Sequence, residues 1–124
     1  MTVENAKPPA ILIVEDEPLL RIGAVKIIEY AGFEVIEAAS ADEAIRILEC
    51  RSDIRLVFTD IHMPGSMDGL TLAHAVRNRW PPIKIIVTSG RELIAQHALP
   101  EGGRFFAKPY DPIQITTTLR EWVL

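Results

Sequence analysis

Acidic, hydroxyl and amine side chains follow four short apolar runs of this 124-residue chain. Glu15 and Asp16 follow the first run, Asp60 ends the third, Thr88 follows the fourth and Lys108 the fifth. Grouped carboxylates repel one another unless a cation joins them, and an all-oxygen ligand set favours a hard ion such as Mg²⁺. A cation, an ammonium and a hydroxyl together suit a phosphoryl group, and a carboxylate among them can be its nucleophile. The sequence therefore predicts a phosphoryl-binding site with Asp60 as the candidate nucleophile.

A fold that brings the ends of these runs together is required. The runs are apolar on successive residues, as in parallel strands covered on both faces. They lie at Ala10–Val14, Val35–Ala39, Leu56–Thr59, Ile83–Val87 and Arg104–Ala107. Alternation with helical segments predicts right-handed βαβ units in a doubly wound α/β fold, which binds ligands beyond the carboxyl ends of its strands.

The helical segments are marked by apolar stripes and by residues that suit helix ends. The first stripe runs through Leu20, Ala24, Ile27, Ile28 and Ala31. Pro18 suits a first helical position, and Ser40 with Glu43 forms a capping box. The segment Glu92–Leu99 has the poorest helical pattern of the chain.

Composition limits the class of protein. The formal charge of −4 is mild, and Lys and Arg are scattered, which argues against direct nucleic-acid binding. The single cysteine, Cys50, permits no internal disulfide and suits a reducing compartment. Residues 1–9 contain no apolar signal segment, and every apolar run is too short to span a bilayer. We expect a flexible N-terminal tail at 1–9 and one cytoplasmic domain at 10–124, without membrane insertion.

Five segments together resemble the receiver domain of two-component response regulators. They occur in the family's order: ILIVEDE (11–17), LVFTDIHMPG (56–65), DGLTLAHAVR (68–77), IIVTSG (85–90) and FFAKPY (105–110). The resemblance covers nearly the whole chain. It implies a flavodoxin-like α/β fold, a doubly wound five-stranded parallel sheet of order 2-1-3-4-5 flanked by five helices.

The resemblance also implies a role for each reactive residue. Asp60 is similar to the phosphoacceptor aspartate, Thr88 to the switch hydroxyl and Lys108 to the lysine that pairs with the phosphate. Asp16 resembles the direct Mg²⁺ ligand, and Glu15 its neighbour acting through metal-bound water.

Further positions take roles from the same resemblance. Asp60 and the backbone carbonyl of His62 resemble the remaining Mg²⁺ ligands, and Phe105 falls at the aromatic switch position. Ser89, a small residue, and Gly90 fall where the family modulates access to the acceptor and the lifetime of the phosphate. The Lys108–Pro109 bond is expected to be cis, a form found almost only before proline.

Three departures from the family pattern stand out. Ser66 is an extra residue in MPGSMDG, so a reshaped loop is expected after the acceptor. Phe105 replaces a tyrosine of some relatives and offers no phenol hydroxyl. The stretch 91–103 is short and glycine-rich, which predicts an abbreviated fourth helix.

The function expected from these residues is a signalling phosphoacceptor and not a turnover enzyme. A sensor histidine kinase or a histidine phosphotransfer protein is expected to phosphorylate Asp60 in a Mg²⁺-dependent reaction. A downstream protein is expected at the face formed by the fourth helix, the fifth strand and the last helix, and the resemblance allows a weak homodimer.

Two alternatives remain open. An aspartate-nucleophile phosphohydrolase generally carries a second acid two residues after its nucleophile, where this chain has His62. A degenerate receiver would act only as an interaction module, but all the reactive positions are present.

Overall fold

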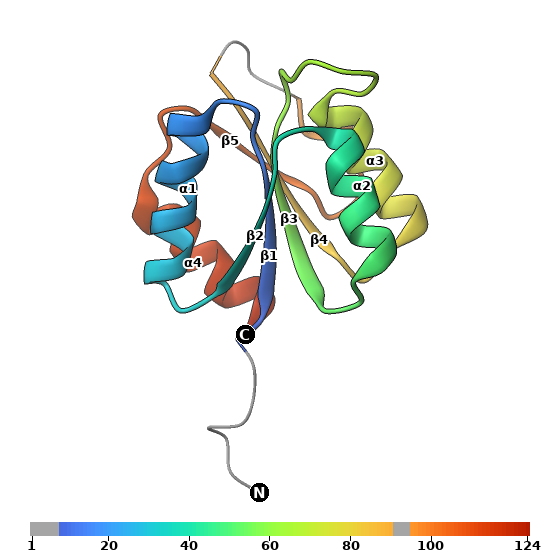
Figure 1. The fold of residues 1–124 in the computed structure, drawn as a ribbon. Helices are drawn as coiled ribbons and strands as arrows, with labels where there is room; N and C mark the ends of the chain where they lie inside the picture. Colours follow the sequence, from blue (N-terminus) through green and yellow to red (C-terminus); the bar gives the residue numbers. More distant parts are fainter. Residues whose placement is uncertain (1–7, 91–94) are drawn as a thin grey trace, which may run out of the picture.

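The computed structural model describes residues 8–90 and 95–124 of the chain. Five parallel strands form one sheet in the order β2-β1-β3-β4-β5, which confirms the predicted topology. The strands are β1 (Ala10–Val14), β2 (Glu34–Ala38), β3 (Ile54–Asp60), β4 (Lys84–Ser89) and β5 (Arg104–Ala107). Figure 1 shows α1 (Pro18–Tyr30) and α4 (Pro112–Val123) on one face of this sheet, and α2 (Ala41–Cys50) and α3 (Gly69–Arg79) on the other.

The expected number of five helices is wrong for the described residues, which contain four α-helices. Where the fourth of five was expected, over Glu92–Leu99, the described part holds only the 3₁₀ turn Gln96–Ala98. Residues 91–94 lie outside the described part. The last helix of the chain is therefore α4.

Two apolar cores, one on each face, hold the sheet between its helices. All five residues of β1 are buried. Leu12 and Val14 belong to the core under α2 and α3, whereas Ile11 and Ile13 belong to the core under α1 and α4. Because successive side chains of a strand point to opposite faces, a strand covered on both sides is apolar throughout. This explains the non-alternating runs in the sequence.

Side-chain caps fix where the helices begin. The Ser40 hydroxyl accepts a hydrogen bond from the Glu43 amide at 3.1 Å, as predicted. The Asp68 carboxylate accepts one from the Thr71 amide at 2.8 Å. Such caps satisfy amides that have no partner inside the helix. They therefore also fix the loops that precede α2 and α3.

The strand register brings the carboxyl ends of the strands level with one another. Val14 of β1 pairs with Thr59, Asp60 pairs with Thr88, and Ser89 pairs with Ala107. The residues that follow β1, β3 and β5 therefore emerge at the same edge of the sheet. In the described ranges, no helix combines the length and apolar composition that crossing a membrane would need.

Gly69 is expected to be indispensable, because a Cβ there would overlap the backbone oxygen of Asp60. Gly69→Ala forces α3 away from the end of β3. Overpacking of this kind costs about 1–3 kcal/mol, and a clash with backbone, which cannot rotate away, belongs at the upper end or beyond. Urea unfolding should show a lower midpoint with an unchanged slope.

Gly23→Ala is the matched control. Gly23 lies inside α1, where a Cβ would meet nothing within 4 Å. The same substitution should stabilise the chain by about 0.5–1 kcal/mol, because alanine loses less backbone entropy in a helix than glycine does. A Gly69→Ala variant as stable as the wild type would contradict the described contact between α3 and β3.

Candidate functional site

A cleft of about 300 Å³ opens at the carboxyl edge of the sheet. It is lined by Glu15, Asp16, Glu17, Leu20, Asp60, His62, Gly90 and Lys108. The acids come from the end of β1 and from β3, and the lysine follows β5. The structure thus brings together acids and an amine that lie up to 93 residues apart in the sequence.

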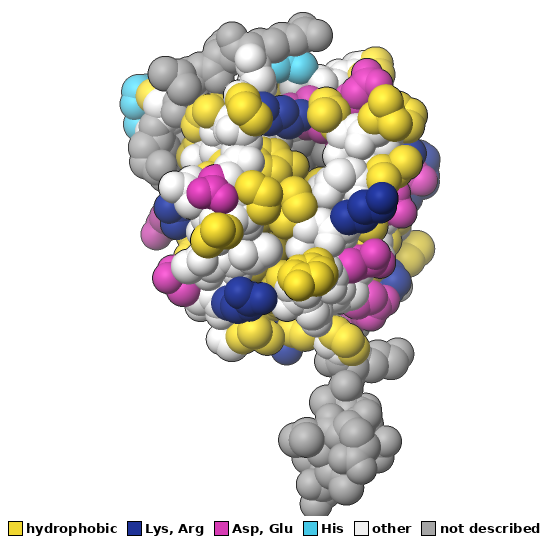
Figure 2. Space-filling view, turned by 90° about the vertical axis from the view of Figure 1, so that its left-hand side faces the viewer, with side chains coloured by type: hydrophobic (Ala, Val, Ile, Leu, Met, Phe, Trp, Pro, Cys, Tyr) yellow, Lys and Arg dark blue, Asp and Glu magenta, His cyan; other side chains and the backbone are white. Residues whose placement is uncertain are grey.

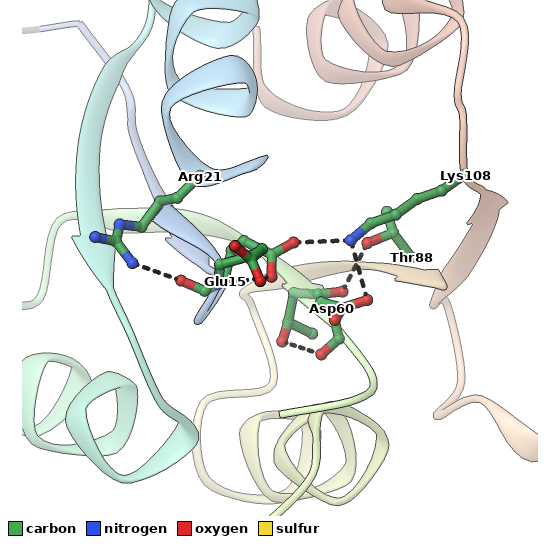
Figure 3. A network of polar contacts seen from close by, with 7 residues as sticks. Glu15, Arg21, Asp60, Thr88 and Lys108 are labelled. Atoms are coloured by element: carbon green, nitrogen blue, oxygen red, sulfur yellow. Dashed lines mark hydrogen bonds and ion pairs between the residues drawn. The ribbon is translucent and has the colours of Figure 1, made fainter. Parts of the chain in front are cut away.

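Lys108 is the centre of the polar contacts in the cleft. Its Nζ donates to Glu15 Oε1 at 2.8 Å and lies 3.3 Å from Asp60 Oδ1. Figure 3 shows the Lys108 side chain approaching both carboxylates from the side opposite Arg21. Asp60 is largely buried, with 8% of its surface exposed, yet it lines the cleft. One ammonium is therefore shared by two buried acids.

Burial and charge shift the pKa values of this pair upward. Burial raises the pKa of Glu15 above its ordinary value, and the hydrogen bond from Lys108 offsets only part of that effect. Burial acts to lower the pKa of Lys108, but its contacts with Glu15 and Asp60 outweigh burial and raise it. Lys108 therefore stays charged at neutral pH, while the acids around it are held under mutual repulsion.

Three carboxylates form a cluster that could hold a metal ion. Glu15, Asp16 and Asp60 each offer one oxygen, and these oxygens lie within 4.8 Å of one another. The cluster contains neither sulfur nor imidazole, so the donor set fits a hard cation such as Mg²⁺ better than zinc or copper. His62 lines the same cleft, and the role of its carbonyl as a further ligand stays a prediction.

Thr88 lies beside Asp60 at the end of β4. The residue is buried and pairs with Asp60 across β3 and β4. Its hydroxyl donates to the Thr59 carbonyl oxygen at 3.4 Å, a long and therefore weak hydrogen bond. A stronger acceptor in the cleft could replace this bond at little cost.

Ser89 and Gly90 follow Thr88 and differ in their surroundings. Ser89 is buried, whereas Gly90 is exposed and lines the cleft. A Cβ on Gly90 would lie 3.5 Å from the Cβ of Lys108, in ordinary contact with it. Side chains at position 90 would therefore pack along the stem of the lysine, and the modulating roles of both residues stay predictions.

Phe105 lies in β5 opposite Val87 and is half-buried. Its ring packs against the core under α2 and α3. The expected movement of this ring is not tested by one structure and stays a prediction. The expected cis peptide bond between Lys108 and Pro109 is confirmed.

Arg21 belongs to the site, and the sequence reasoning missed it. Its Nη1 donates to the backbone oxygen of Glu15 at 2.8 Å, and its Nε donates to Glu37 at 3.1 Å. Figure 3 shows the contact of Arg21 with Glu15. Together with its bond to Glu37, the arginine connects the acidic segment to α1 and to β2. Its position one turn into a helix that follows three acids is the signal that could have identified it.

An apolar rim beside the cleft was also missed. A hollow of about 330 Å³ is lined by Leu20, Lys108, Pro109 and Tyr110. Leu20, the first residue of the predicted helical stripe, is 49% exposed, and Ile113 in the first turn of α4 is 72% exposed. Figure 2 shows hydrophobic side chains gathered on this side of the molecule, over α1 and α4. Apolar groups are therefore exposed next to the cleft.

The chain is similar to known proteins over most of its length. The family model described as response regulator receiver domain matches residues 11–120. The sensor kinase CckA of Brucella abortus (strain 2308) is 38% identical over 116 residues, which make up 90% of this chain and 12% of CckA. The aerobic respiration control protein ArcA of Escherichia coli (strain K12) is 36% identical over 115 residues, 90% of this chain and 47% of ArcA.

A solved structure with the same fold is the receiver domain of NtrX from Brucella abortus. It superposes with a TM-score of 0.82 at 31% identity, over 91% of this chain and 97% of that one. The chain spans an eighth of CckA and less than half of ArcA. The likeness therefore concerns one domain of those longer proteins.

Mg²⁺ is expected to raise the Tm of the chain, because an ion that binds only the folded state stabilises it. The gain is about 2.7 kcal/mol at a hundred times Kd. Asp16→Asn should remove most of the shift. The measurement is thermal unfolding with magnesium chloride against sodium chloride at equal ionic strength.

Asp53→Asn is the control, since it removes the same charge from an exposed residue just before β3, at the opposite edge of the sheet. This variant should keep the full Mg²⁺ shift. A wild type that does not respond, or an Asp16→Asn variant that responds fully, would show that the acidic cluster is not the metal site.

Proposed function

The chain belongs to the family of response regulator receiver domains, which are phosphoacceptors of two-component signalling, and we propose that Asp60 is the side chain that takes the phosphoryl group. The observation that carries this proposal is the shared contact of Lys108 with Asp60 and Glu15 in an open cleft. Asp60 is the acid of this cluster that ends β3. The Lys108 ammonium lies beside its carboxylate, and Thr88 pairs with it in the neighbouring strand.

The proposed step is an in-line transfer from phosphohistidine. A carboxylate oxygen of Asp60 attacks phosphorus, an acyl phosphate O–P bond forms, and the N–P bond to the donor histidine breaks. The electron pair of that bond returns to the imidazole nitrogen, which takes up a proton. Lys108 pairs with the phosphoryl oxygens, whose charge must be offset as the bond forms.

Glu15, Asp16 and Asp60 would hold Mg²⁺, with the His62 carbonyl as a further ligand. When bound, the ion offsets the charge of the carboxylates and of the phosphoryl oxygens. Lys108 alone cannot do so, because it already faces two buried acids. The carboxylate cluster thus supplies the nucleophile, and the lysine holds the group that arrives.

Phosphorylation would change the conformation through Thr88. Its weak bond to the Thr59 carbonyl can be exchanged for a bond to a phosphoryl oxygen, which is a stronger, charged acceptor. Movement of Thr88 toward the cleft would leave space beside β5 into which Phe105 turns. Phosphate contacts would favour this second packing and so shift the population of the two states.

The donor is a sensor histidine kinase or a histidine phosphotransfer protein, and its helix would dock on the apolar rim of Leu20, Pro109, Tyr110 and Ile113. Leu20, Pro109 and Tyr110 of this rim line a hollow that shares Leu20 and Lys108 with the cleft. Apolar contact there would hold the donor histidine over Asp60. Orientation of two reacting groups in this way is worth several kcal/mol of the barrier.

The remaining parts of the proposal follow from the family. The chain signals by binding a downstream protein near β5 and α4, turns over no free substrate and works in the cytoplasm beside kinases that use ATP. Weak self-association would be compatible with this role. The cognate kinase would have to be found by comparing phosphotransfer rates from several donors.

Asp60→Asn should abolish labelling by radioactive acetyl phosphate. The label on the wild type should require Mg²⁺ and be released by hydroxylamine, which cleaves acyl phosphates. An amide oxygen is a poor nucleophile, so the expected loss is complete. Asp53→Asn, the same change at an exposed position, should label like the wild type, and labelling that persists in Asp60→Asn would contradict the assignment.

Leu20→Ala should slow phosphotransfer from a protein donor by about tenfold, as the loss of a central apolar contact costs about 1–2 kcal/mol. Labelling by acetyl phosphate, which needs no docking surface, should change less than about twofold on the same reasoning. Tyr30→Ala is the control, because Tyr30 is 93% exposed at the other end of α1. Equal losses with both donors would show that Leu20 serves the cleft and not docking.

A further inference from the structure

The loop of residues 61–68 joins the proposed phosphoacceptor to α3 and forms one wall of the site. Its first amide, that of Ile61, donates to the Thr88 carbonyl oxygen at 3.0 Å, and the amide of Gly69 donates to the Ile61 oxygen at 2.9 Å. Both ends of the loop are therefore fixed by backbone hydrogen bonds. The position of the residues between them is decided by what the loop itself contacts.

The interior of the loop packs unevenly. Met63 and Met67 are partly buried against the core under α2 and α3. Pro64, Gly65 and Ser66 form an exposed tip. Gly65 has a φ of +114°, which a residue with a side chain rarely adopts. The tip thus turns away from the core, and Ser66 lies at its end.

The Ser66 hydroxyl connects this tip to another element. Its Oγ donates to the carboxylate of Asp42, 2.9 Å from Oδ1 and 3.0 Å from Oδ2. The two residues are 24 positions apart in the sequence. A hydrogen bond to an ionised acceptor is stronger than one between neutral groups. Ser66 is also the residue by which this loop exceeds the usual receiver pattern, so the extra residue has a partner.

The position of Asp42 is held by the capped start of α2. It lies in the first turn of α2, where a negative charge is stabilised by the helix dipole. The start of that helix is held by the Ser40 cap and by the Glu43 carboxylate, which accepts from the Ala39 amide at 2.6 Å. The bond from Ser66 therefore fastens the loop to a rigid helix end.

The loop wall adjoins the carboxylate cluster. A hollow of about 320 Å³ is lined by Asp16, His62, Met63, Pro64 and Asp68. Two of these, Asp16 and His62, also line the cleft that contains Asp60. Displacement of the loop tip would therefore move the wall that carries His62 relative to Asp16.

We propose that Asp42, through its hydrogen bond with Ser66, is a positioning residue that holds the 61–68 loop in the arrangement that binds Mg²⁺. This inference rests on the proposed function and names a determinant that lies outside the carboxylate cluster. If this hydrogen bond is lost, the loop samples more conformations, and a smaller fraction of the molecules has the arrangement that binds Mg²⁺. The apparent Kd rises by the reciprocal of that fraction, whereas the filled site still reacts at the same rate.

The test measures Mg²⁺ affinity by calorimetric titration, together with the rate of acetyl phosphate labelling across Mg²⁺ concentrations. Ser66→Ala and Asp42→Ala should each weaken Mg²⁺ binding about twofold to tenfold, the range expected for one hydrogen bond. The labelling rate at saturating Mg²⁺ should stay unchanged. The double variant should be no weaker than the single ones, because both remove the same bond.

Two conservative variants distinguish the effect of the hydrogen bond between Ser66 and Asp42 from the effect of the negative charge of Asp42. Ser66→Thr keeps a hydroxyl, and Asp42→Asn keeps an oxygen that accepts but loses the charge, so both should bind Mg²⁺ nearly like the wild type. Ser52→Ala, at an exposed serine between α2 and β3, is the matched control. Weak binding in Asp42→Asn with normal binding in Ser66→Ala would show that Asp42 acts only through its charge, and would overturn the proposal.

Failure of this proposal differs from failure of the proposed function. A wild type that binds Mg²⁺ and is labelled at Asp60, with Ser66→Ala unchanged in Mg²⁺ affinity, overturns the positioning role alone. A wild type that neither binds Mg²⁺ nor is labelled overturns both. Tm values of all variants within a few degrees of the wild type exclude general unfolding as the cause of a weaker affinity.

Discussion

Repulsion among carboxylates that are held together at one edge of a sheet is the constraint on which this site depends. Glu15, Asp16 and Asp60 present oxygens within 4.8 Å of one another, and Lys108 is the cation that contacts two of them. Burial raises the pKa of Glu15, and the nearby charge of Asp60 adds to that rise. A site in this condition gains from any added positive charge. The carboxylates draw in a metal ion, and the positive charge of that ion is what the oxygens of an arriving phosphoryl group need, which links metal binding to the chemistry.

The fold keeps these carboxylates close together through features that lie outside the cleft. Strands buried on both faces hold β1 and β3 in a register that levels their carboxyl ends. Close approach of α3 to the end of β3 is possible because Gly69 has no side chain. Arg21 fastens the backbone of Glu15 from the opposite side. Mutual repulsion therefore cannot spread the acids apart, because each is attached to an element whose position is set by core packing.

Much of this could be predicted from the sequence, and the remainder could not for physical reasons. Alternating buried strands and helices predict which strand ends meet, so the grouping of Asp60, Thr88 and Lys108 followed from topology. The contact of Ser66 with Asp42 joins a loop residue to the first turn of α2, and no periodic pattern encodes it. The spacing of Leu20 fits the helical stripe whose residues Ala24 and Ile28 are buried, but Leu20 lies near the start of α1 and is exposed. Local patterns specify the elements, whereas contacts between loops depend on how the elements pack.

The account can be tested most directly by mapping the modified atom. The phosphorylated chain would be reduced with borohydride, which converts an aspartyl phosphate to homoserine, and its peptides would be sequenced by mass spectrometry. The account predicts homoserine at position 60 and unchanged aspartate at position 16. Homoserine at position 16, or modification spread over several exposed carboxylates, would contradict it.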